Sequence, residues 1–175
     1  MNAGRRQDAA PSRSPDDIGR NACLDLLAIA LAHRPGGARG TALFLLDCSG
    51  PRPADAVAAE VERRLRAAAP PWHRLLRGDA GEFAVMAQGL VDGGAVLAAA
   101  ARLVHAFDDA LQAMELAPCP DIAIGIAFAS QPTAGAESML RAAESGLCES
   151  RAATRPAATA GRPSIRSARP SRRTP

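Results

Sequence analysis

The chain contains no lysine and no tyrosine, and aromatic residues make up only 3% of its 175 residues. A platform of aromatic rings that stacks single-stranded nucleic acid is therefore excluded. Long uncharged apolar runs are also missing: the best run, residues 22–32, contains Asp25, so no membrane-spanning helix is expected. The acidic pair Asp16 and Asp17 before this run is unlike a secretory leader. We therefore expect a cytoplasmic protein.

Metal-ligand and disulfide patterns are lacking as well. The four cysteines (Cys23, Cys48, Cys119 and Cys148) show no C-x-x-C spacing, and the three histidines are scattered along the chain. A zinc site is not expected from such spacing, and we interpret the cysteines as buried reduced thiols.

Charge is unevenly distributed along the chain. Residues 151–175 contain seven Arg and no acid, whereas residues 16–150 contain 11 Arg and 17 acids, a net charge of −6. We expect disorder in residues 1–15, one folded domain in residues 16–152, and a disordered tail rich in Arg, Pro and Ala in residues 153–175. Because the folded part is acidic, a basic DNA-binding domain is not supported.

Hydrophobic periodicity predicts eight elements. Asp16 and Asp17 are expected to cap the first helix, Pro53 to open the second, and an Asp/Gly-containing link to join two strands as a hairpin. The expected helices are 18–33, a second ended by Pro70, a third spanning about 96–114, and 134–152; the expected strands are 41–47, 73–78, 82–88 and 121–129.

This order contains βαββαβ between two outer helices. It predicts an α+β fold: a ferredoxin-like or nucleotide-cyclase-type antiparallel sheet with helices packed on it, preceded by an N-terminal helix. The fold alone does not decide the function.

Four segments occur in the order of a known family. They are the apolar strand ending in Asp47, the hairpin RGDAGEFAV (77–85), the strand IAIGIA (122–127) and the helix AESGLCESR (143–151). Together they resemble the GGDEF domains of diguanylate cyclases, which condense two GTP into cyclic di-GMP in bacterial signalling. The resemblance spans about residues 16–152.

The sequence differs from the family pattern at positions that the family uses for binding phosphate and metal. The five signature positions are Asp79, Ala80, Gly81, Glu82 and Phe83. The resemblance implies glycines at the first two positions, where the backbone approaches phosphate, and here Asp79 brings a negative charge. It implies an acidic metal ligand at the third position, which Gly81 cannot supply because it has no side-chain oxygen.

Other family features are also altered. The resemblance implies a second metal ligand at Asp47, but the Phe-Lys pair and the Asn expected after it are absent, and the loop is shorter. The R-x-x-D motif that binds product in the family would fall at Pro70 and His73, so it is absent here, and binding of cyclic di-GMP by that route is not supported. The phosphate-contacting Lys of the last helix corresponds to Arg151.

These substitutions predict a pseudo-enzyme with no catalytic residue, no bound metal and no cofactor. Asp47, Glu82 and Arg151 are candidates for residual contacts to a cation or a nucleotide. Of the two interpretations, however, we favour the one in which Asp47 and Glu82 are two solvated acids at the sheet edge. Phe83 is expected to pack in the core.

We therefore expect an inactive signalling or protein-interaction module whose partner is a protein. Two alternatives stay open: a domain that senses GTP or cyclic di-GMP through an altered pocket, and binding of nucleic acid or an anionic surface by the arginine-rich tail. Nucleic acid is the less expected partner, and the sequence leaves the oligomeric state open.

Overall fold

The computed structural model describes residues 15–33, 39–49, 55–71, 73–78, 81–114, 121–130 and 135–154. Among them, no helix has both the length and the apolar character that a membrane crossing requires. The elements are α1 (Pro15–Ala32), β1 (Gly40–Ser49), α2 (Asp55–Ala68), β2 (His73–Arg77), β3 (Phe83–Leu90), α3 (Gly93–Ala113), β4 (Asp121–Ala129) and α4 (Ala136–Thr154).

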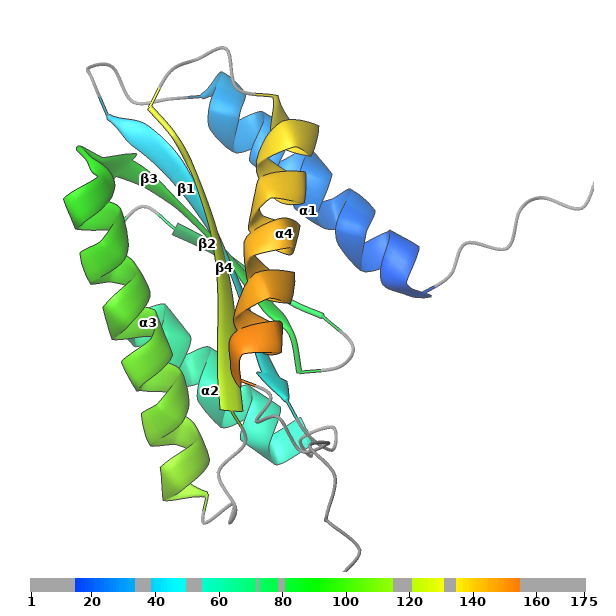
Figure 1. Ribbon diagram of the computed structural model, residues 1–175, viewed down its shortest axis with the longest axis vertical. Coiled ribbons are helices and arrows are strands. Elements are labelled where there is room, and N and C mark those ends of the chain that lie inside the picture. The colour runs from blue at the N-terminus through cyan, green and yellow to red at the C-terminus, as the bar shows by residue number, and fades with distance from the viewer. Residues whose placement is uncertain are drawn as a thin grey trace, which may run out of the picture.

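The four strands form one sheet in the order β2-β3-β1-β4, in which every neighbouring pair is antiparallel (Figure 1). This is the βαββαβ arrangement that the sequence predicts, and the α+β fold class is confirmed. The apolar strand β1 lies inside the sheet, with β3 on one side and β4 on the other.

Helices cover both faces of the sheet (Figure 1). On one face, α2 and α3 pack against alternate residues of β1 and β3, among them Phe44 and Phe83. On the other face, α1 and α4 pack against the residues that point the opposite way, among them Leu43 and Met86. Because successive strand residues face opposite sides, the continuous apolar run of β1 fills both cores.

The helix α4 lies unusually close to β4. A Cβ added to Gly125 of β4 would lie 2.0 Å from the carbonyl oxygen of Ala143 and 2.6 Å from the amide nitrogen of Leu147. Gly146 of the helix faces the same point, where its own added Cβ would lie 3.6 Å from the Cα of Gly125. A side chain at residue 125 would therefore push the helix off the sheet.

Several local expectations need correction. The first helix begins at Pro15, so Asp16 and Asp17 lie within α1 rather than before it. The first strand continues past Asp47 to Ser49. Cys23 and Cys48 are buried as expected, but Cys148 is exposed on α4. The expectations for Pro53, Cys119, residues 1–14 and residues 155–175 lie outside the described residues.

Candidate functional site

Asp47 lies near the end of β1, where it faces Ala123 of β4 in the register. It is one of two buried polar or charged residues among those that the structure describes, with 8% of its surface exposed. The interpretation of Asp47 as a solvated acid is therefore wrong. A carboxylate in this environment needs a charged or hydrogen-bonding partner.

The signature hairpin joins β2 to β3. The amide of Gly78 donates a hydrogen bond to the carbonyl oxygen of Glu82 at 2.8 Å, and Gly81 adopts a left-handed backbone with φ of 82°. A residue with a side chain is strained in that conformation, so the hairpin favours glycine where the family has a metal-binding acid. Asp79 and Ala80 lie outside the described residues.

The last two signature residues point in different directions. Phe83 is buried in the core, as expected, and its ring meets that of Phe107 edge-to-face with centroids 5.6 Å apart. The side chain of Glu82, by contrast, is about half exposed, at 51%. Of the two, only Glu82 is accessible to a ligand.

Arg151 of α4 joins Asp47 to Glu82. Its Nε donates to Asp47 Oδ2 at 2.7 Å, and its Nη2 lies 2.6 Å from the same oxygen. The same Nη2 donates to Glu82 Oε1 at 2.9 Å. The three candidate residues therefore form one cluster, which draws on a strand, a hairpin and a helix that are far apart in sequence.

Burial and charge oppose each other in this cluster. Desolvation raises the pKa of Asp47, and the attraction of Arg151 offsets only part of that rise. Burial lowers the pKa of Arg151, but the carboxylates of Glu82 and Asp47 outweigh it, so the net pKa is raised. The two residues differ because Asp47 is the more deeply buried partner. Arginine stays charged at every working pH.

This cluster does not fit a divalent cation. Mg²⁺ needs near-octahedral oxygen ligands, but Asp47 is occupied by a guanidinium and Gly81 has no side-chain oxygen. Within the described part of the chain, no group of three or more His, Cys, Asp or Glu side chains is placed to hold a metal ion.

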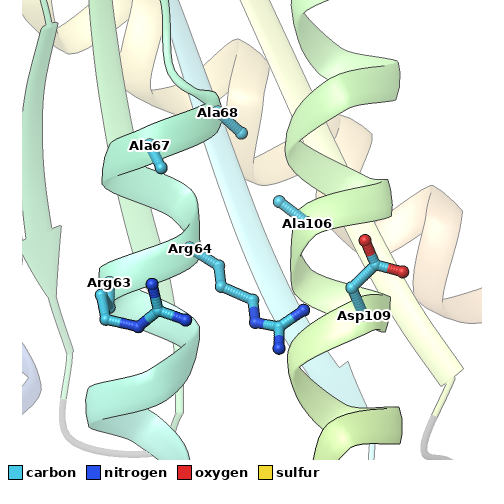
Figure 2. A pocket seen from close by; sticks show the side chains of 6 residues that line it. All are labelled: Arg63, Arg64, Ala67, Ala68, Ala106 and Asp109. Atoms are coloured by element: carbon cyan, nitrogen blue, oxygen red, sulfur yellow. The ribbon is translucent and has the colours of Figure 1, made fainter.

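A shallow depression of about 370 Å³ lies between α2 and α3 (Figure 2). Arg63, Arg64 and Asp109 line it together with three alanines, Ala67, Ala68 and Ala106. Both arginines are bonded to Glu60 on their own helix, at 2.7–2.8 Å. We interpret these pairs as the solvated face of α2, which contributes little to stability.

Sequence comparison finds no match: no protein family and no curated protein matches the chain. The structure does match solved structures. A sensory box/GGDEF family protein from Caulobacter crescentus is 23% identical, with a TM-score of 0.58, and the match covers 77% of this chain and 92% of that one. The GGDEF domain of DgcB from the same organism, solved with c-di-GMP, is 16% identical, with a TM-score of 0.56 and coverage of 86% and 95%.

A third match is the diguanylate cyclase SiaD from Pseudomonas aeruginosa, solved in complex with its activator SiaC. It is 13% identical, with a TM-score of 0.59, and the match covers 77% of this chain and 55% of that one. At these identities the comparisons establish the fold. The chain has the diguanylate-cyclase-like fold of GGDEF domains.

Proposed function

We propose that this chain is a catalytically inactive GGDEF-like module that acts in bacterial cyclic di-GMP signalling by binding a protein partner. The observation that carries the proposal is the ion pair between Asp47 and Arg151. Phosphoryl transfer depends on positioning and on metal ions that neutralise phosphate charge. Here the acid that matches a family metal ligand is bonded to an arginine, and Gly81 replaces the other.

The intact core supports a role that needs the fold but not the chemistry. Both faces of the sheet are packed, and Phe83 of the signature is a core residue. SiaD, which has a similar fold, was solved with an activator protein, so a protein partner is a reasonable class to expect. We also propose that the module acts in the cytoplasm, in keeping with the sequence.

The other functions that the sequence leaves open have less support. A nucleotide sensor needs a cation for phosphate, and Arg151 already donates to two carboxylates. The arginine-rich residues 155–175, on which binding of nucleic acid would rest, lie outside the described residues.

Turnover of GTP tests the proposal. Purified protein incubated with GTP and Mg²⁺ is expected to form no cyclic di-GMP above the background of an Asp47→Ala variant, as measured by liquid chromatography. The expectation follows because phosphoryl transfer loses its charge stabilisation without a bound metal. Product formed by the wild-type chain and abolished in Asp47→Ala would contradict it.

A further inference from the structure

In the cluster of Asp47, Glu82 and Arg151, two carboxylates surround one positive group, as they would in a cation site, and the positive group is the guanidinium of Arg151. One carboxylate comes from the strand β1 and the other from the hairpin before β3, and the positive group between them comes from α4. One nitrogen, Nη2 of Arg151, lies within 2.9 Å of an oxygen of each carboxylate. The guanidinium is thus the shared counter-ion of both acids.

We propose that Arg151 is a built-in counter-ion that keeps divalent cations away from Asp47 and Glu82. This inference rests on the proposed function and deepens it by naming the group that closes the site. An external ion must displace a cation that is covalently part of the chain and permanently charged. It must also lose water while finding few protein oxygens in return.

The packing of α4 on β4 places Arg151 next to the two carboxylates. The adjacent Ser150 accepts a hydrogen bond from the amide of Ile124 in β4 at 3.2 Å through its Oγ. Earlier in the helix, at Ala143 and Leu147, the close approach to Gly125 holds α4 against the same strand. The backbone of Arg151 is therefore held close to the sheet, so only the torsions of its side chain remain to be ordered when the guanidinium reaches the carboxylates.

The inference predicts that removing the guanidinium makes the acids available to a metal ion. Mn²⁺ binding is measured by electron paramagnetic resonance on the full chain. Arg151→Gln is expected to bind Mn²⁺ at least about tenfold more tightly than the wild-type chain, a step of about 1.4 kcal/mol. Arg151→Lys, which keeps a positive charge, is expected to resemble the wild-type chain, and Asp47→Asn added to Arg151→Gln is expected to abolish the gain.

Arg20 offers a matched control. Its guanidinium also bridges two carboxylates, Glu137 at 2.8 Å and Glu144 at 3.2 Å, and its side chain is 35% exposed against 39% for Arg151. Both glutamates are exposed side chains of α4, at 49% and 41%, whereas Asp47 is only 11% exposed, so their attraction for an ion is weakened by solvent and salt. Arg20→Gln is expected to leave Mn²⁺ binding unchanged.

A folded Arg151→Gln chain with wild-type Mn²⁺ affinity overturns the inference, as does an equal gain in Arg20→Gln. If Arg151→Gln does not fold, the wild-type chain provides the test. Mn²⁺ at about 1 mM, a concentration that populates weak sites, is expected to leave the amide resonances of Ala123 and Phe83 sharp. Selective broadening of those two signals contradicts the inference. Failure of the proposed function would appear separately, as cyclic di-GMP formation.

Discussion

Gly125→Ala is expected to destabilise the fold by about 3 kcal/mol, at the upper end of the range for overpacked cores. The added methyl would lie 2.0 Å from a backbone oxygen of α4, and backbone cannot move aside as a flexible side chain can. Thermal unfolding followed by circular dichroism should show a fall in Tm of roughly 6–12 °C for a domain of this size.

Gly19→Ala is the matched control for this substitution. Gly19 lies within α1, and apart from its chain neighbours and the backbone of its own helix no atom lies within 4 Å of an added Cβ there. Alanine is the better helix former, so this variant should be more stable by about 0.5–1 kcal/mol. An unfolding free energy of Gly125→Ala within about 0.5 kcal/mol of the wild-type value would show that α4 does not pack on β4 in this way.

Arg151→Gln is expected to lower the free energy of unfolding at neutral pH by about 1–3 kcal/mol. This lies between the loss for exposed ion pairs and that for fully buried ones, because Asp47 is buried while Arg151 is partly exposed. Most of the loss comes from leaving the carboxylate of Asp47 without its counter-ion. The double variant Asp47→Asn/Arg151→Gln should therefore be more stable than Arg151→Gln alone, as measured by urea denaturation.

The loss should also depend on pH in a definite direction. The pKa of Asp47 is raised in the folded chain from its ordinary value of 3.8, mainly by desolvation. The folded chain therefore holds the Asp47 proton more tightly than the unfolded chain does. The stability that this proton contributes is fully present below the unfolded pKa and is lost as pH rises through the folded pKa. Without Arg151 the charged carboxylate loses its counter-ion and that pKa rises further, so the deficit of Arg151→Gln should grow as pH rises above the unfolded pKa. A deficit that is constant with pH would contradict the assigned role of Asp47.

Much of the fold was predictable because it depends on local patterns. The apolar run of β4 matches its predicted range, Asp121–Ala129, and the strands 73–78 and 82–88 form the expected hairpin. The start of α1 was missed because Asp16 and Asp17 have the composition of a cap, whereas the helix already includes Pro15. The exposure of Cys148 was not predicted because it depends on which face of α4 packs on the sheet. The residue type alone does not indicate that face.

For the site, the sequence predicted which residues belong to it but not that they contact one another. The resemblance selected Asp47, Glu82 and Arg151 separately, but no sequence signal connects an arginine to an aspartate 104 residues before it. Their contact depends on how closely α4 packs on β4, and this close packing depends on the absence of a side chain at Gly125. Gly125 was recognised as part of a strand motif, yet its role in bringing a helix close to the sheet emerges only in three dimensions.

A crystal structure grown in the presence of Mn²⁺ would show whether Arg151 or a metal ion lies between the two carboxylates, because anomalous scattering locates the ion. We expect no anomalous peak between Asp47 and Glu82, with the guanidinium of Arg151 bonded to both. A Mn²⁺ ion bonded to Asp47, with Arg151 displaced, would contradict this expectation.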